Sequence, residues 1–239
     1  MTLKASGSMG LAAQAPLQMS LSIAADLAQI PAPKSWRLAG SVNAEVKATG
    51  DARGPRMDGS IVAERLSLSS MDGAEGALVS VPEAKVQLEG DRATLSEIRA
   101  TVGGGALTLS GGVGLATLVE AARGRATRPA QGHEAQIRAS WEGVQAGPLL
   151  ASLGCTQKVR ASLSGNLEVR GGLGSLQEMS GALRVPATDV GVEDLELQIA
   201  PVAIALDQGS ITMDRVTLSS ALGRLDVQGR LDLVRRSLE

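Results

Sequence analysis

The sequence predicts an all-β fold in which neighbouring strands run antiparallel, and three observations lead to this prediction. Apolar and polar residues alternate with a period of two over many segments, as they do in a strand with one apolar face. Clusters of Gly with Asp or Asn, which supply the positive φ angles of tight turns, separate these segments. The turn signals recur about every 8–12 residues, which is typical of all-β chains.

The first half of the chain contains the first five expected strands. Residues 17–23 read LQMSLSI and carry an apolar residue at every odd position. Residues 42–48 read VNAEVKA and place the apolar residues at every even position, between Asn, Glu and Lys. The same periodicity predicts further strands at 60–69, 84–89 and 105–115.

The second half repeats this pattern. Residues 135–142 read AQIRASWE and again alternate. The longest run covers 158–170 and spans about 40 Å if it is straight. The remaining expected strands are 181–186, 194–200, 202–207, 210–219 and 224–233. Helix-compatible stretches are few: residues 24–30, 115–122 and 144–153.

An internal repeat divides the chain. Residues 88–115 and 206–233 align without a gap at an offset of 118, with six of the 28 positions identical. Residues 122–134 show no periodicity and are expected to form a flexible connection. We therefore expect a first repeat unit at 1–121 and a second at 135–239, each a meander of strands, in one continuous sheet.

Composition excludes several kinds of function. The chain has 239 residues, of which 44% are hydrophobic and 20% charged, and its net charge of −2 offers no basic field for nucleic acid. Two Trp without Phe or Tyr leave almost no stacking platform for bases. One His and one Cys give no metal site, and no nucleophile lies beside a base, so we expect no metal, no cofactor and no enzymatic activity.

The apolar face of these strands must be covered, because exposing it over a dozen strands costs many kcal/mol. A second sheet would cover it in a closed sandwich or barrel. Alternatively, the sheet curls into an open trough and lipid acyl chains cover its inner face. The apolar residues of these strands are mostly aliphatic and include no Phe or Tyr. Such a surface suits contact with mobile acyl chains better than a tightly packed protein core.

The glycine-punctuated alternation resembles the AsmA-like superfamily, and within it most closely the TamB proteins. The motif Gly-x-Leu-x-Leu-x-Gly-x-Leu-x-Leu is matched by residues 105–115 (GALTLSGGVGL) and 223–233 (GRLDVQGRLDL). Residues 54–61 and 161–171 are similar to the preceding units of such proteins, and residues 146–154 resemble the short helix that precedes a strand in them.

This resemblance implies an elongated, curved antiparallel β-groove, or β-taco, of repeated meanders with a few short helices. It implies a periplasmic body of a longer protein of the cell envelope, anchored in the inner membrane through parts absent from this chain. The implied activity is phospholipid transport between membranes and outer-membrane biogenesis, with a possible outer-membrane barrel partner in a translocation and assembly module. The alternative expectation is a closed structural or adhesive β-solenoid or β-sandwich without a ligand.

The candidate lipid-binding residues are the apolar positions of the glycine-punctuated strands. Phospholipid acyl chains are the expected partner, and binding is expected to be hydrophobic and not stereospecific. The candidates are Leu107, Leu109, Val113, Leu115, Val159, Leu163, Leu167, Val169, Leu225, Val227, Leu231 and Leu233.

Overall fold

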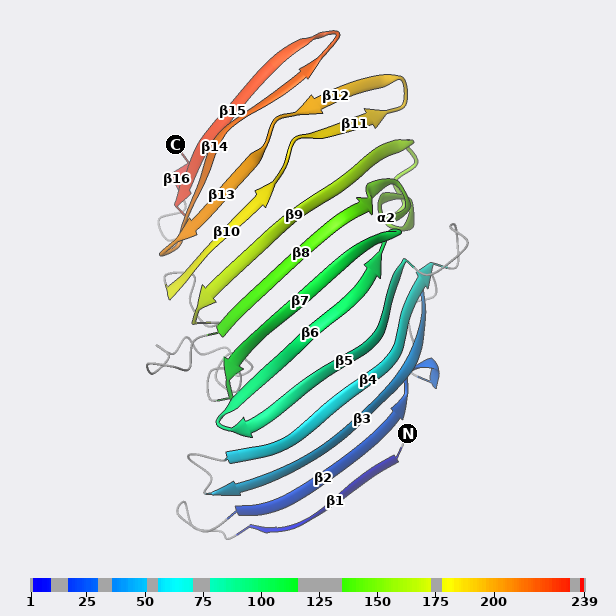
Figure 1. Ribbon diagram of the computed structural model, residues 1–239, viewed down its shortest axis with the longest axis vertical. Coiled ribbons are helices and arrows are strands. Elements are labelled where there is room, and N and C mark those ends of the chain that lie inside the picture. Colours follow the sequence, from blue (N-terminus) through cyan, green and yellow to red (C-terminus); the bar gives the residue numbers. More distant parts are fainter. Residues whose placement is uncertain are drawn as a thin grey trace.

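The fold is an antiparallel sheet of meandering strands (Figure 1). The computed structural model describes residues 2–9, 17–29, 36–50, 56–70, 78–115, 135–172, 178–232 and 237–238. Within these residues, sixteen strands form a single sheet. The helical elements whose full bounds lie among them are the 3-10 turn η1 (Leu27–Gln29) and the helix α2 (Ala146–Ser152).

The strands follow one another along the sheet in chain order from β1 to β10. Their bounds in this first part are β1 (Thr2–Met9), β2 (Leu17–Asp26), β3 (Trp36–Gly50), β4 (Arg56–Ser70), β5 (Val79–Gly90), β6 (Arg92–Val102), β7 (Gly105–Gly114), β8 (Ala135–Gln145), β9 (Val159–Gly171) and β10 (Met179–Val185).

The order changes after β10, where β13 and then β14 continue the sheet. The hairpin of β11 and β12 lies between β9 and β14, and β15 and β16 follow β14 at the end of the sheet. The bounds are β11 (Thr188–Val192), β12 (Leu195–Ile199), β13 (Val202–Asp207), β14 (Ser210–Ser220), β15 (Gly223–Asp232) and β16 (Ser237–Leu238).

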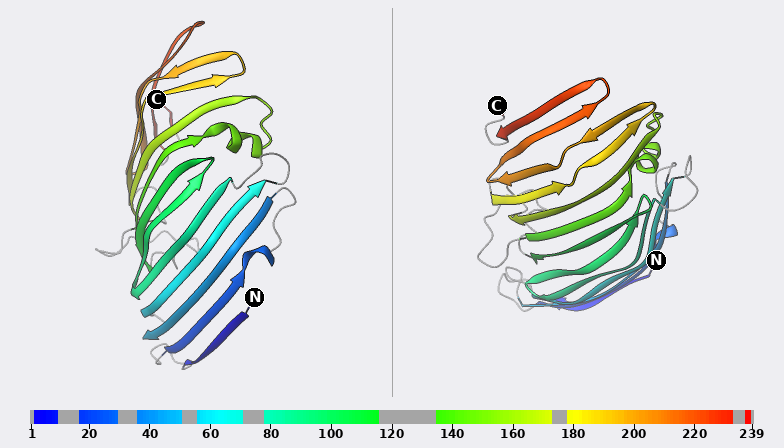
Figure 2. Two further views of the ribbon diagram at one scale, coloured as in Figure 1. Left: turned by 45° about the vertical axis from the view of Figure 1, so that its right-hand side comes forward. Right: turned by 45° about the horizontal axis from the view of Figure 1, so that its top comes forward.

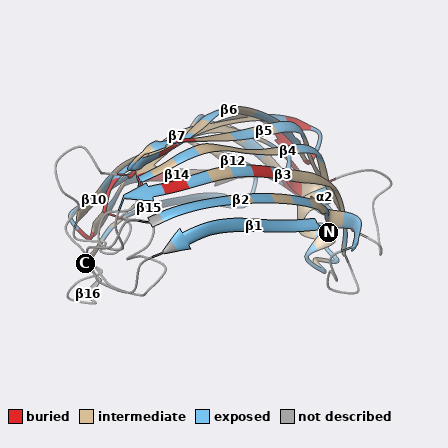
Figure 3. Cartoon of the chain, turned by 90° about the horizontal axis from the view of Figure 1, so that it is seen from below, coloured by how far each residue is buried: buried red, intermediate tan, exposed pale blue. Residues whose placement is uncertain are grey.

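The sheet is arched, and the described residues add no second layer of strands to it (Figures 2 and 3). Figure 3 shows that the strands bend along their own length. Several strand pairs carry a register shift: between Ala39 and Ser41 on β3, between Leu95 and Ile98 on β6, and between Met213 and Val216 on β14. Such bulges bend a strand and increase its twist, which accounts for part of the curvature.

The internal repeat has a structural counterpart. Shifted by 118 residues, the bounds of β6 and β7 coincide with those of β14 and β15. The bulge between Leu95 and Ile98 likewise coincides with the one between Met213 and Val216. β7 pairs directly with β8, so the sheet runs on past the predicted boundary between the two units. The connection predicted at 122–134 lies outside the described residues, and the division into units stays a prediction.

The all-β antiparallel prediction is confirmed, and each strand expected from the alternation exists in the described part of the chain. Four observed strands, β1, β6, β11 and β16, have no counterpart among the expected ones. The helix-compatible stretch at 144–153 contains α2, whereas Ala24, Ala25 and Asp26 belong to β2 and precede η1. The stretch at 115–122 lies outside the described residues except for Leu115.

Candidate functional site

One face of the sheet carries an unbroken apolar row. Following the paired residues from strand to strand gives a line that crosses the sheet from β1 to β15 and contains only aliphatic residues and glycine. This row consists of Leu3, Ile23, Ala44, Ile61, Val86, Leu95, Gly111, Ile137, Val169, Gly181, Leu206, Ile211 and Leu231.

On one side of this row, the next line of paired residues carries only polar residues and glycine. Because successive side chains point to opposite faces, this polar row lies on the other side of the sheet. It consists of Lys4, Ser22, Glu45, Ser60, Gln87, Thr94, Gly112, Gln136, Arg170, Ser180, Asp207, Ser210 and Asp232. We call the two sides the apolar face and the polar face.

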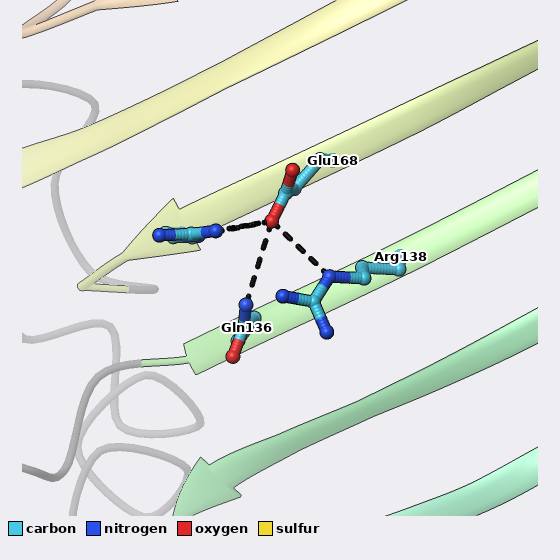
Figure 4. Close-up of polar contacts among 4 residues, drawn as sticks. Gln136, Arg138 and Glu168 are labelled. Atoms are coloured by element: carbon cyan, nitrogen blue, oxygen red, sulfur yellow. Dashed lines mark hydrogen bonds and ion pairs between the residues drawn. The ribbon is translucent and has the colours of Figure 1, made fainter.

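The polar face is the convex one. Figure 4 shows the side chains of Gln136, Arg138 and Glu168 in front of the sheet, with the strands in the same order and direction as in Figure 1. The view of Figure 3 turns this face upward, where the arch is convex. The apolar row therefore lies on the concave side. Side chains converge on a concave surface, which agrees with the low exposure of Ala44 and Ala48, 6% and 7%, in a sheet of one layer.

The apolar face is crowded but is not sealed by the described residues. None of their side chains falls below 2% exposure, so they contain no fully buried core. The most buried apolar residues are mainly alanines, such as Ala93 and Ala161. Larger residues of the same face remain open to solvent, for example Leu3 at 59% and Ile137 at 39%. This face can therefore offer aliphatic contact surface to another molecule.

Ten of the predicted lipid-binding residues lie on the apolar face. On β7, Leu107, Leu109 and Val113 pair with Ala100, Ile98 and Ala93 of β6, all of the same face. The candidates of β9 and β15 also point to this side, because their positions are in phase with the row members Val169 and Leu231. They are Val159, Leu163, Leu167, Val169, Leu225, Val227 and Leu231.

The other two predicted residues are placed differently. Leu115 follows the end of β7, and its backbone N–H donates a hydrogen bond to the carbonyl oxygen of Asp91 at 2.7 Å. Leu233 lies outside the described residues.

Sequence reasoning missed part of the apolar face. A second line of paired residues contains Ile98, Leu109, Ala139, Leu167, Leu183, Ile204 and Met213. Ile98 and Leu183 were not candidates, although the strand pattern at 181–186 could have indicated Leu183. Trp141 also belongs to this face and lies over Gly165, where an added Cβ would stand 2.6 Å from the indole Cζ2. Trp141 and Gly165 are neighbours only through the cross-strand register of β8 and β9.

The polar face carries a small charged network on β8 and β9 (Figure 4). The carboxylate of Glu168 accepts hydrogen bonds from Nη2 of Arg170 at 2.5 Å and from Nε of Arg138 at 3.2 Å. The Gln136 amide lies 3.5 Å from the same oxygen. These bonds, led by the one from Arg170, lower the pKa of Glu168 below its ordinary value.

Arg170→Gln is expected to raise the pKa of Glu168, measured by NMR titration of its side-chain carboxyl. The bonded form is the ionised one, so the stabilisation exists above the pKa of the unfolded chain and disappears as the pH falls through the lower folded value. Arg37→Gln, on a distant strand, serves as the control and should leave the titration midpoint unchanged. An unaltered midpoint in Arg170→Gln would contradict this account.

Other side chains of interest carry little chemistry. Cys155 donates from Sγ to Oε1 of Gln157 at 3.1 Å, and no group of three metal-ligating side chains converges among the described residues. His133 lies outside them. None of the helices within the described ranges combines the length and apolarity needed to cross a bilayer.

Comparison with known proteins adds no relative: no family model, curated protein or solved structure matches the chain.

Proposed function

We propose that the apolar face forms an open groove that holds phospholipid acyl chains, and that the chain is a segment of a bridge-like protein of the cell envelope. The observation that supports this proposal most is the unbroken apolar row on the concave side of a one-layered sheet. A closed structural module requires a second layer over the same face, and the described residues supply none.

The dimensions of the apolar row suit a lipid guest. With neighbouring strands about 4.8 Å apart, the row from β1 to β15 extends over roughly 60 Å. The hydrocarbon core of a whole bilayer is only about 30 Å thick, so the row exceeds the length of one acyl chain several times. Several lipids can therefore lie one after another along the sheet.

The chemistry of the apolar face favours movement over tight binding. Each methylene group removed from water contributes about 0.8 kcal/mol, wherever along the row it is buried. The row offers aliphatic side chains and glycine without hydrogen-bonding groups, so nothing in it fixes one position of the guest. A lipid can slide along the sheet while its head group stays in water at the rim, and transport in this form is passive. We propose that the chain acts in this way in the periplasm, in intermembrane lipid transport and outer-membrane biogenesis.

Native mass spectrometry of the gently purified chain is expected to show adducts with the masses of phospholipids. The apolar face can bind the acyl chains of any phospholipid in the expressing cell, because hydrophobic contact does not depend on the head group. Uptake of a fluorescent phospholipid by delipidated protein provides the independent measurement. Repeated preparations that are free of lipid and take up none would favour the closed, ligand-free alternative.

A further inference from the structure

The sheet is interrupted where two prolines face each other. β10 and β13 pair as far as Val185 and Val202, and β11 and β12 pair from Thr188 and Ile199 onward in the same register. This register places Pro186 opposite Pro201. Proline has no N–H to donate, so the two residues cannot form ladder hydrogen bonds with each other. The hairpin is therefore divided here, and Figure 1 shows the bend between its two halves.

The neighbouring strand β9 is also unpaired at this point. β9 pairs with β10 up to Asn166 and with β11 again from Ala161 onward, so its residues 162–165 have no ladder partner on this side. Five residues of the hairpin, 185–189, lie opposite these four. The mismatch parts the strands, and a cavity of about 450 Å³ opens at the break.

The cavity is lined from both faces of the sheet. Val185 and Val202 are in phase with Leu183 and Ile204 and belong to the apolar face, whereas Arg184 and Asn166 belong to the polar face. Pro186 and Pro201 also line the cavity. An amphiphilic molecule could thus meet polar groups on one side and aliphatic groups on the other.

Arg184 is a free cation at this cavity. Its side chain is exposed and has no hydrogen-bond or ion-pair partner among the described residues. Arg138 and Arg170 on the same face are instead bound to Glu168. Arg184 also lines a smaller hollow of about 240 Å³ beside Thr212 and Asp214, but no ion pair joins it to Asp214. A guanidinium without a carboxylate partner suits a phosphate, which it can bind through two N–H groups.

We propose that this break is a side port at which a phosphate-bearing lipid binds, with its phosphate on Arg184 and its acyl chains directed past Val185 and Val202 toward the apolar face. The inference rests on the proposed function and adds to it a preferred lipid class. The row itself accepts any acyl chain, whereas the port distinguishes lipids with an accessible phosphate from uncharged lipids.

The test measures the affinity of the wild-type protein and of Arg184→Gln for two fluorescent lipids. These are phosphatidic acid and a diacylglycerol with the same acyl chains. A charge-assisted hydrogen-bond pair corresponds to about a tenfold preference of the wild type for phosphatidic acid. Arg184→Gln should bind the two lipids equally, while the matched control Arg138→Gln should keep the preference. Circular dichroism verifies the fold of both variants.

The outcomes separate this inference from the proposed function. If the wild type binds both lipids equally, or Arg184→Gln keeps the preference, the port is refuted and the groove proposal stands. Binding of neither lipid to the wild type refutes the proposed function. Inorganic phosphate is added as a competitor, and displacement of phosphatidic acid by millimolar phosphate alone would identify a site for a free anion and overturn the port.

Discussion

The affinity for acyl chains at the middle of the sheet is expected to fall roughly 100-fold when Leu109 is replaced by Asp, while the rest of the row still holds lipid, and no change is expected when its neighbour Thr108 is replaced by Asp. The two residues are adjacent on β7, and Leu109 lies on the apolar face while Thr108 lies on the polar face. A carboxylate among acyl chains costs about 3 kcal/mol, which corresponds to that loss in affinity. The measurement is the number of fluorescent phospholipids taken up per delipidated chain, which should be lower for Leu109→Asp than for Thr108→Asp.

A second pair of single variants, Val227→Asp and Gln228→Asp, repeats this comparison on β15, where the apolar position is partly exposed. Val227 is already 37% exposed, so a carboxylate at this position keeps much of its contact with water and costs the fold little. Thermal denaturation of each variant distinguishes loss of uptake from loss of structure. Equal uptake in Leu109→Asp and Thr108→Asp, with both folded, would show that the two faces do not differ in lipid contact and would remove the main support for the groove.

Gly59→Ala is expected to destabilise the fold by about 3 kcal/mol or more, because the position has no room for a side chain. Gly59 has a φ of +150°, and a Cβ there would stand 2.0 Å from the carbonyl oxygen of Glu45 and 2.9 Å from Cα of Val46. Both obstacles are backbone atoms of β3, so β3 and β4 must separate locally. Chemical denaturation measures the change.

Gly112→Ala is the matched control for this prediction. A Cβ at Gly112 would meet the guanidinium of Arg92 at 3.2 Å and the carbonyl oxygen of Ala93 at 3.4 Å. The guanidinium is the far end of a flexible side chain and can shift, so the free energy of unfolding should change little. A similar small change in both variants would mean that β3 and β4 are less closely held than the structure shows.

The sequence predicts strands best where their alternation is uninterrupted. Residues 159–169 keep their apolar residues at odd positions throughout, and β9 covers this run. β6 was missed because its bulge shifts the pattern from Leu95, at an odd position, to Ile98, at an even one. β11 was missed because Val190 and Val192 alone give too short an alternation.

The candidate site was predictable in part for a similar reason. Alternation assigns Leu107, Leu163 and Leu231 to one face, but it has the same form in a sandwich and in an open sheet. The sequence therefore could not decide whether a second layer covers the apolar face. The side port was beyond prediction, because Pro186 and Pro201 become neighbours only through the register of the hairpin.

The meander has a consequence for how such a protein can change in size. From β1 to β10 each strand pairs with the strands next to it in the chain, so inserting or deleting a hairpin leaves the remaining pairings intact. Each added hairpin would lengthen the sheet by about 10 Å and prolong both rows in register. Evolution can thus match the reach of this architecture to the width of a compartment in small, regular increments.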